Sequence, residues 1–420
     1  MLSYDLSTSQ EYGEERISQT GLSTGPRTPL PKRLSVLMVT GVYHPEVSGA
    51  ANQCRQLVQA LKHRTRFRVL TTTRDSNLPP RCEVDGVEIF RVLLKGKSLL
   101  DYFIVFLRFS TFFLFSRKDF QIIHLHGFSL KSALLTVLSR IFHKKVIIKM
   151  TSVGHDDPVA MRQRGFLINY FFSKADAYVG VSPQFEGLYR QSRLPLNRLK
   201  QIPNGVDTNR FRPITTREKV LLRDKVKFPQ KMKLILFVGH FSREKGPDIL
   251  LKTWKRYVAE TFLDTGIVFV GSKNPDHYEV DTELVKDIHQ MAEPYIDDRI
   301  FFIESTDEIE KVYKAADLFV LPSLREGLPN SLLEAMACGL PVIVSRLEGI
   351  TDWVIADGVM GLLVEPSIRN DLGRAIKSVL NDDTLAGSFG REARRTVLDR
   401  FSMKRVLEQY SKLYGDLIFC

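Results

Sequence analysis

At 420 residues, the chain has room for two domains of ordinary size, each with its own apolar core. Its net charge of +12 favours an anionic partner, but its aromatic residues do not follow the pattern of a nucleic-acid module, so we expect no nucleic-acid partner. Its four cysteines lack the spacing of a zinc site or a disulfide framework, so the cytoplasm, a reducing compartment, is the expected location.

The first residues differ in composition from the rest of the chain. Up to about Thr28 they are rich in Ser, Thr, Glu and Gly, and they lack the apolar run of a secretory signal. We therefore expect residues 1–33 to form a disordered N-terminal tail.

Residues 34–213 alternate short apolar runs with stretches of helical spacing. The first run, 34–40, is followed by Leu57 and Leu61 on one face of a predicted helix. Further runs lie at 67–71, 87–92, 121–125, 146–150 and 177–181. Such alternation predicts a parallel sheet with crossover helices, and hence a first Rossmann-like domain over 34–213.

The segment 99–115 is the most hydrophobic stretch of the chain. Asp101 and Arg108 interrupt it, and it falls short of the about 20 apolar residues that span a bilayer, so we do not expect it to cross a membrane. Two partly compatible interpretations stay open. The segment is either a buried helix that packs on the first sheet or an interfacial helix whose Phe side chains enter lipid.

The basic residues favour attachment of the first domain to a membrane surface. Much of the basic excess falls in the first half of the chain, where Arg117 and Lys118 follow the Phe-rich segment. We therefore expect any contact with an anionic membrane surface to lie in the first domain, with Phe112 and Phe113 as lipid contacts. The expected location is thus cytoplasmic, with peripheral membrane association left open.

A second series of apolar runs predicts a second Rossmann-like domain over residues 214–402. The runs lie at 233–239, 266–271, 299–303, 317–321, 340–345 and 361–364. The two series are joined by 202–213, which is dense in turn-forming residues and is interpreted as the interdomain linker. Residues 403–420 are expected to form a last helix.

The segment 322–345 carries the strongest functional signal. It is predicted to contain a strand end, a polar loop, a helix and the next strand, with Glu326 and Glu334 framing the loop. Because ligands of parallel sheets bind beyond the carboxyl ends of the strands, we expect this loop to face a crevice. Backbone N–H groups near Asn330 and Ser331, at the predicted helix start, are available to bind a phosphate.

This segment closely resembles the nucleotide-sugar site of the family 4 glycosyltransferases. The shared features are E-x(7)-E, Pro-Ser before the first Glu, Gly after it, and Glu-Ala-Met-Ala-x-Gly-x-Pro-Val at the second. The linker, Asn-Gly-Val-Asp…Phe-x-Pro, also resembles that of the family. The resemblance runs from about Leu34 to the C-terminus. It implies the GT-B fold, an α/β fold in which two Rossmann-like domains face each other across a cleft and a C-terminal helix returns to the first domain.

The resemblance also implies an activity. Members transfer a sugar, with retention of anomeric configuration, from a nucleotide diphosphate sugar on the second domain to an acceptor, here a glycan or a lipid-linked precursor. The family's usual proposal is that the leaving phosphate helps to deprotonate the acceptor hydroxyl, so no general base is named. We expect no cofactor and no metal, because cations and helix N-termini can stabilise the leaving diphosphate.

In the second domain, Gly239 to Gly246 resembles the family's Gly-Arg-Leu-x-x-Glu-Lys-Gly loop. Lys245 is then the catalytic cation that contacts the diphosphate. His240 stands where the family usually has Arg, and His is only partly charged near neutral pH. The second cation is therefore either His240 or Arg243.

The loop residues also receive roles from the resemblance. Glu326 is expected to reach the donor sugar or the reacting phosphate, and Glu334 to accept hydrogen bonds from the ribose hydroxyls. Further donor contacts are expected from Gly327, Leu328, Asn330 and Ser331.

In the first domain, two positions are expected to face the donor. Gly49 precedes Ala50 where family members often have Gly-Gly, and its loop is expected to approach the diphosphate from the opposite wall. His126 ends a strand that resembles the family's His-x-His-Gly. It is either a donor ligand or a packed histidine that is satisfied by the backbone.

A third first-domain segment departs from the family pattern. Many relatives carry Thr-x-His after this strand, and His155 is the candidate for the sugar-contacting histidine, although its spacing differs. Thr151 or Ser152 in that place, and acceptor contacts from Asp156 and Asp157, stay open as alternatives. The two carboxylates lack a flanking D-x-D, which weighs against a metal site.

These departures leave a second class of protein open. His240, Ala50 and the region of His155 are compatible with a catalytically silent nucleotide-sugar-binding or scaffold protein. The intact Glu326 and Lys245 favour an enzyme instead.

Overall fold

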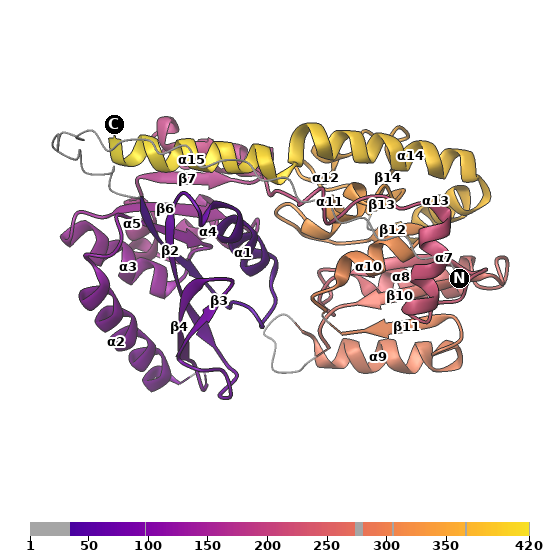
Figure 1. Cartoon of the computed structure of the whole chain (residues 1–420), viewed down its shortest axis with the longest axis horizontal. Coiled ribbons are helices and arrows are strands. Elements are labelled where there is room, and N and C mark those ends of the chain that lie inside the picture. Colours follow the sequence, from indigo (N-terminus) through magenta and orange to yellow (C-terminus); the bar gives the residue numbers. More distant parts are fainter. Residues whose placement is uncertain (1–33, 97, 274–279, 305, 366–367, 420) are drawn as a thin grey trace, which may run out of the picture. The chain divides into compact units, whose positions relative to one another are not determined.

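The computed structural model describes residues 34–96, 98–273, 280–304, 306–365 and 368–419 (Figure 1). The predicted tail, residues 1–33, lies outside the described residues.

The first half of the described chain builds an eight-stranded sheet with the order β3-β4-β2-β1-β5-β6-β7-β8. Its strands are β1 (Ser35–Thr40), β2 (Arg66–Thr73), β3 (Arg81–Val84), β4 (Val87–Leu93), β5 (Ile122–His126), β6 (Lys145–Met150), β7 (Ala177–Gly180) and β8 (Leu199–Gln201). All neighbours pair in parallel except β3 and β4, which confirms the predicted parallel sheet. β3 and β8 were not predicted, because both are short and partly exposed edge strands without an apolar run.

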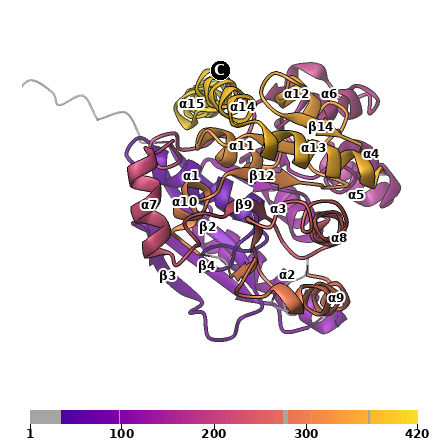
Figure 2. The same ribbon diagram turned by 90° about the vertical axis from the view of Figure 1, so that its right-hand side faces the viewer.

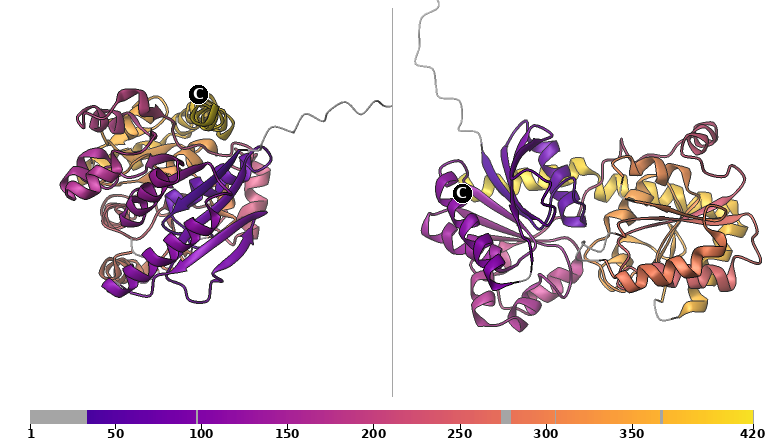
Figure 3. Two further views of the ribbon diagram at one scale, coloured as in Figure 1. Left: turned by 90° about the vertical axis from the view of Figure 1, so that its left-hand side faces the viewer. Right: turned by 90° about the horizontal axis from the view of Figure 1, so that it is seen from below.

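Helices cover both faces of this sheet. They are α1 (Gly49–Leu61), α2 (Leu99–Ser116), α3 (Leu130–Ile141), α4 (Pro158–Gln163), α5 (Phe166–Phe172) and α6 (Pro183–Arg190). Successive side chains of a strand point to opposite faces, so Leu37 and Val39 of β1 pack in the core that includes α2 and α3, whereas Val36 and Met38 pack toward α1. α3 contacts both α2 and α5, and the three helices lie side by side on one face (Figures 1 and 3).

The second half builds a six-stranded parallel sheet with the order β11-β10-β9-β12-β13-β14. Its strands are β9 (Lys233–Val238), β10 (Thr265–Val270), β11 (Ile300–Ile303), β12 (Leu318–Leu321), β13 (Val342–Ser345) and β14 (Leu362–Val364). Each strand lies within a predicted apolar run or differs from it by one residue. These strands are mostly buried on both faces, which is why they read as continuous apolar runs.

The helices of the second half form two layers. They are α7 (Thr216–Lys225), α8 (Pro247–Tyr257), α9 (Thr282–Ala292), α10 (Ile309–Ala315), α11 (Asn330–Ala337), α12 (Thr351–Val354), α13 (Arg369–Asn381) and α14 (Asp383–Thr396). α8 contacts α9 and α13, while α10 contacts α7 and α11 (Figure 2).

The last helix, α15 (Met403–Phe419), packs on the first sheet (Figure 1). Val406, Tyr410 and Tyr414 are buried in the same core as Met38 of β1 and Cys54 of α1. The expected return of the C-terminal helix to the first domain is therefore confirmed.

Candidate active site

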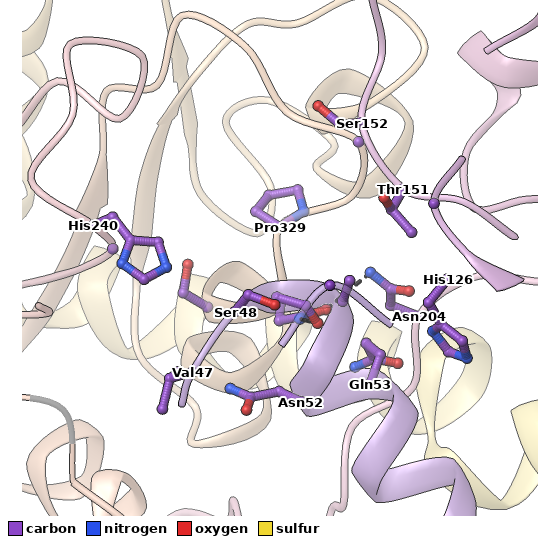
Figure 4. A pocket seen from close by; sticks show the side chains of 18 of the residues that line it. Val47, Ser48, Asn52, Gln53, His126, Thr151, Ser152, Asn204, His240 and Pro329 are labelled. Atoms are coloured by element: carbon purple, nitrogen blue, oxygen red, sulfur yellow. Dashed lines mark hydrogen bonds between the residues drawn. The ribbon is translucent and has the colours of Figure 1, made fainter. Parts of the chain in front are cut away.

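A cavity of about 1150 Å³ opens at the carboxyl ends of strands from both sheets. The segments that follow β1, β5 and β6 line one wall, and those that follow β9, β10 and β12 line the other (Figure 4). This is the position at which ligands bind to parallel sheets. The cavity brings together all of the predicted site residues: Gly49, His126, His155, Gly239, His240, Arg243, Lys245, Glu326, Gly327, Leu328, Asn330, Ser331 and Glu334.

On the second wall, Lys245 and the buried Glu326 form a partly buried ion pair. The Lys245 Nζ donates to both carboxylate oxygens of Glu326, at 2.8 and 2.7 Å. The Ser323 hydroxyl donates to the same carboxylate at 2.8 Å, and Glu326 is only 6% exposed. The Lys245 ammonium is thus paired with the Glu326 carboxylate, and an anion that binds Lys245 must compete with this carboxylate.

Gly246 brings this lysine and this glutamate together. Its φ of +67° is left-handed, and a Cβ at this position would lie 2.5 Å from the Pro322 carbonyl oxygen. Only glycine fits there without displacement. The loop after β9, which carries Lys245, can therefore lie directly against the loop after β12, which carries Glu326.

Glu334 has a partner that the sequence did not reveal. The Tyr313 hydroxyl donates to its Oε2 at 2.9 Å, and burial raises the pKa of this carboxyl to about 7, although the Tyr313 hydrogen bond acts in the opposite direction. Glu334 lies in the middle of α11, not at the helix start where it was predicted. No local pattern pointed to Tyr313, since it lies on α10 and meets Glu334 only through the fold.

Asn330 joins the two walls at the N-terminus of α11. Its Nδ2 donates to the Gly49 carbonyl at 3.0 Å, and its Oδ1 accepts from the Asn204 Nδ2 at 2.9 Å. Asn204, in the linker, also donates to the Leu328 carbonyl at 2.9 Å. The first N–H groups of α1 and α11 have no partner within their helices, so the positive ends of two helix dipoles meet beside this amide.

The walls also touch through their backbones. A Cβ on Gly327 would lie 2.1 Å from the Thr151 carbonyl oxygen, and a Cβ on Gly49 would lie 3.5 Å from the Asn330 Nδ2. Position 327 therefore leaves no room for a side chain where the second wall meets Thr151 of the first.

On the first wall, His126 is buried without a hydrogen bond. Neither ring nitrogen has a partner among the described residues, so the interpretation as a histidine satisfied by the backbone is wrong. Burial keeps its pKa well below the usual 6.5, assisted by His124 and Lys149, and the ring is therefore neutral at pH 7. His124 is hydrogen-bonded to the Tyr414 hydroxyl of α15 at 2.8 Å, whereas His126 reaches the cavity.

The turn that contains His155 is built around two buried carboxylates. Asp156 accepts from the N–H and hydroxyl of Thr151 and from the Ser152 N–H, and burial raises its pKa to about 6. Asp157 accepts from the N–H groups of Gly154, Val159 and Ala160, and so caps α4. The side chain of Asp157 thus shapes the turn and does not line the cavity, whereas Asp156 and the exposed His155 do.

The two candidates for the second cation differ in their surroundings. The Arg243 Nε donates to Asp281 Oδ2 at 2.9 Å, and the side chain is 64% exposed. His240 directly follows Gly239 at the end of β9, and Figure 4 shows its ring directed toward the N-terminus of α1. Among the described residues, no three His, Cys, Asp or Glu side chains gather as a metal site would require.

Two family models match the chain. The model of the glycosyl transferase 4-like domain covers residues 48–205, and that of the glycosyl transferases group 1 covers residues 219–396. The chain is 25% identical over 305 residues to an N-acetyl-alpha-D-glucosaminyl L-malate synthase of Bacillus anthracis. The matched region covers 72% of this chain and 76% of the relative. It is also 28% identical over 231 residues to the UDP-Gal:alpha-D-GlcNAc-diphosphoundecaprenol alpha-1,3-galactosyltransferase of Escherichia coli, over 53% and 55% of the two chains.

Solved structures share the fold. A sucrose-phosphate synthase from Thermosynechococcus elongatus superposes with a TM-score of 0.76 at 22% identity, over 92% of this chain and 99% of the other. Anabaena HepE in complex with UDP-glucose superposes with a TM-score of 0.73 at 18% identity, over 91% and 100%. The predicted resemblance is thereby confirmed: the chain belongs to the glycosyltransferases that join a 4-like domain to a group 1 domain, it has the GT-B fold, and it is an enzyme.

Proposed function

We propose that this enzyme transfers a sugar from a nucleotide diphosphate sugar to a hydroxyl of a glycan or lipid-linked acceptor, with retention of anomeric configuration. The observation that carries the proposal is the Lys245–Glu326 pair, in a cavity that the N-termini of α1 and α11 also line. A partly buried cation and two helix N-termini form a site for a diphosphate. The names of the relatives support such a donor, since one is a UDP-Gal transferase and one structural neighbour holds UDP-glucose.

When the Lys245–Glu326 ion pair separates, each of the two side chains can contact the donor. A diphosphate competes with Glu326 for Lys245, and the carboxylate released by this exchange accepts from a hydroxyl of the donor sugar. Lys245 then stabilises the charge that grows on the leaving diphosphate, an interaction that is stronger in the transition state than in the ground state. Glu334, as a carboxylate, accepts from the ribose hydroxyls.

Retention follows if the acceptor attacks from the face that the diphosphate leaves. The bond between the anomeric carbon and the diphosphate oxygen breaks, and a bond to the acceptor oxygen forms on the same face. The acceptor proton passes to the leaving diphosphate. Stabilisation of this group by Lys245, by Arg243 or His240, and by helix N–H groups requires no metal.

We also propose that the acceptor is presented at a membrane and that the enzyme attaches peripherally to the cytoplasmic side. The support is α2, which has the length and apolar composition of a membrane-crossing helix, although only 22% of it is buried. The E. coli relative is named for a diphosphoundecaprenol acceptor, which is lipid-linked.

A panel of nucleotide sugars, read by thermal shift, tests the donor. At a fixed concentration, the donor that binds most tightly should raise the melting temperature of the wild-type enzyme most, because it binds only the folded state. Lys245→Ala should lose most of this shift. The anomeric configuration of the product, measured by NMR, then tests retention, and an inverted product would contradict the proposed mechanism.

Chelation tests the role of metal. Activity should survive EDTA if Lys245 and the helix N-termini hold the diphosphate. Loss of activity that Mn²⁺ or Mg²⁺ restores would show that a metal takes this role instead.

A further inference from the structure

The helix α2 carries large apolar residues on both its covered and its exposed side, although Asp101 and Arg108 interrupt it. Val105, Phe109 and Phe113 are buried, and the Phe112 ring packs on Phe90 of β4 with 4.5 Å between centroids. A helix that is apolar all round is normally buried in a core or a membrane. The outer side of α2 therefore needs an explanation that the fold of this chain does not supply.

The outer side of α2 exposes large apolar residues over its N-terminal half and again at its C-terminal end, with the exposed Arg108 and Thr111 between them. The exposed fractions range from 39% at Ile104 and Leu114 to 90% at Leu99. The exposed residues are Leu99, Leu100, Tyr102, Phe103, Ile104, Phe106, Leu107, Leu114 and Phe115. Contiguous exposed apolar surfaces of this kind mark sites of interaction with proteins or membranes.

Two neighbouring helices extend this apolar surface. On α3, Leu130 and Ile141 are 67% and 60% exposed; on α5, Phe166, Leu167 and Tyr170 are 80%, 66% and 44% exposed. Since α3 contacts both α2 and α5, these side chains belong to one side of the first domain (Figures 1 and 3). We call this side the α2–α3–α5 face.

The C-terminal ends of the three helices are joined by basic side chains. Arg117, after α2, lies 5.1 Å above the centre of the Phe142 ring, which follows α3. The Arg140 guanidinium of α3 donates to the carbonyl of Lys174, which follows α5. The Lys174 Nζ lies 4.5 Å above the Tyr170 ring. Cations therefore border the apolar surface at this end.

The charge of the face is predominantly positive, although Asp119 and Asp176 lie just beyond the ends of α2 and α5 and Asp176 pairs with Arg140 and Lys145. In residues 99–118, 130–145 and 158–174, the only acidic residue is Asp101. The basic residues of these stretches are Arg108, Arg117, Lys118, Lys131, Arg140, Lys144, Lys145, Arg162, Arg164 and Lys174, of which Lys131 and Arg164 line the cavity. A protein partner would have to supply many acidic groups around an apolar centre, whereas an anionic bilayer offers both over a wide plane.

We propose that the α2–α3–α5 face docks on an anionic phospholipid bilayer, with α2 lying in the plane of the interface. The inner side of α2 belongs to the protein core, so the helix cannot be surrounded by lipid as a spanning helix is. The outer apolar side chains enter the headgroup and acyl boundary, and the basic side chains contact lipid phosphates.

This inference rests on the proposed peripheral attachment and names the surface that performs it. It also corrects the lipid contacts that the sequence suggested. Phe113 is fully buried and Phe112 packs on Phe90, so neither faces outward as lipid contact requires. Phe103 and Phe106, 61% and 50% exposed, are the residues to replace.

The test is flotation of the full chain with phosphatidylglycerol-containing vesicles and with pure phosphatidylcholine vesicles. The wild-type protein should float with the anionic vesicles at low salt. Phe103→Ser combined with Phe106→Ser should lower the bound-to-free ratio at least about tenfold. Leu221→Ser with Leu263→Ser replaces two more exposed apolar residues of the second half, 65% and 76% exposed, and should leave flotation unchanged.

A charge variant separates the electrostatic contribution. Arg117→Glu with Lys118→Glu should lower binding about tenfold at low salt and much less at high salt, because salt screens this attraction. Arg391→Glu with Arg395→Glu, an exposed pair on α14, is the matched control. The thermal shift with the preferred nucleotide sugar should be preserved in every variant, which separates loss of docking from loss of folding or of donor binding.

Three results would overturn the inference. A wild-type protein that stays unbound with anionic vesicles at low salt would remove membrane docking without affecting the proposed transfer reaction. Equal flotation of the Phe103/Phe106 variant and the wild type would place the attachment elsewhere. A dimer in light scattering that this variant dissociates would assign the face to a second copy of the chain.

Discussion

The two walls of the cavity hold their polar groups in different ways. On the second wall, Glu326 binds Lys245 and Ser323, and Glu334 accepts from Tyr313. On the first wall, the ring nitrogens of His126 have no hydrogen-bond partner among the described residues. The second wall is therefore organised before a ligand arrives, whereas the first holds a neutral group whose partner the described chain does not provide.

This difference suggests that the two walls bind different parts of the donor. A charged diphosphate needs cations that are fixed in advance, since such groups stabilise charge without reorganising during the reaction. A sugar hydroxyl needs only a neutral donor or acceptor. An unpaired buried imidazole destabilises the fold, so His126 is expected to regain a hydrogen bond when the ligand binds.

The largest effect is expected at the organised wall. Lys245→Ala should lower kcat/KM about 10²–10³-fold, because it removes a charge whose attraction grows as the diphosphate leaves. The melting temperature should change little by comparison. Lys252→Ala, which removes an exposed lysine paired with Asp248 on α8, is the control and should keep nearly full activity. A Lys245→Ala enzyme as active as the control would show that the wall does not work through this cation.

The contact between the walls gives the next largest effect. Gly327→Ala forces a Cβ against the Thr151 carbonyl, and such overpacking costs about 1–3 kcal/mol, so kcat/KM should fall about ten- to hundredfold as the walls separate. Gly187→Ala is the control, because a Cβ on that helical glycine meets no atom within 4 Å. Steady-state kinetics and thermal melting of both variants check this, and an unaffected Gly327→Ala enzyme would show that the contact is not needed.

The sequence predicted the second wall better than the first for a physical reason. Glu326, Gly327 and Glu334 lie within one short segment between two buried strands, so their spacing along the chain is close to their spacing in the fold. Lys245 follows the neighbouring strand, β9, and meets them at the same edge of the sheet. The order of these residues along the chain is therefore enough to predict that they form the second wall.

The remaining features depend on contacts between distant segments. Tyr313 reaches Glu334 from another helix, and Asn204 reaches Asn330 across 126 residues of chain. The outward face of α2 was left undecided because its sequence is apolar on both sides, and only the positions of β4 and α3 show which side is covered. Such pairings are set by tertiary structure, so no local pattern signals them.

A smaller effect is expected from Tyr313, whose hydroxyl donates to Glu334 on the second wall and lowers the pKa of this carboxyl. In the proposed reaction, Glu334 binds ribose as a carboxylate, so donor affinity should fall as the pH drops through its pKa of about 7. The Tyr313 hydrogen bond lowers this pKa, so Tyr313→Phe should move the fall to higher pH and raise the donor KM about three- to tenfold at pH 7. At pH 9 the difference should narrow, and kcat should change less than KM.

Tyr410→Phe is the matched control for this pH profile. The Tyr410 hydroxyl has no hydrogen-bond partner among the described residues and lies in the core beneath α15, so its removal should leave the profile unchanged. A Tyr313→Phe enzyme whose donor KM rises equally at all pH values would show that Tyr313 acts by packing alone.

The smallest effect is expected from Arg243, and it distinguishes the two candidates for the second cation. Arg243 is 64% exposed and bound to Asp281, so water and salt screen its attraction for the diphosphate. Arg243→Ala should therefore raise the donor KM only a few-fold, and this rise should shrink at high salt. Asp281→Asn, which frees the guanidinium, should lower the KM slightly if Arg243 turns toward the donor. If Arg243→Ala reduces kcat/KM as strongly as Lys245→Ala, the arginine must leave Asp281 during the reaction, and the second wall is less completely organised than the unliganded contacts indicate.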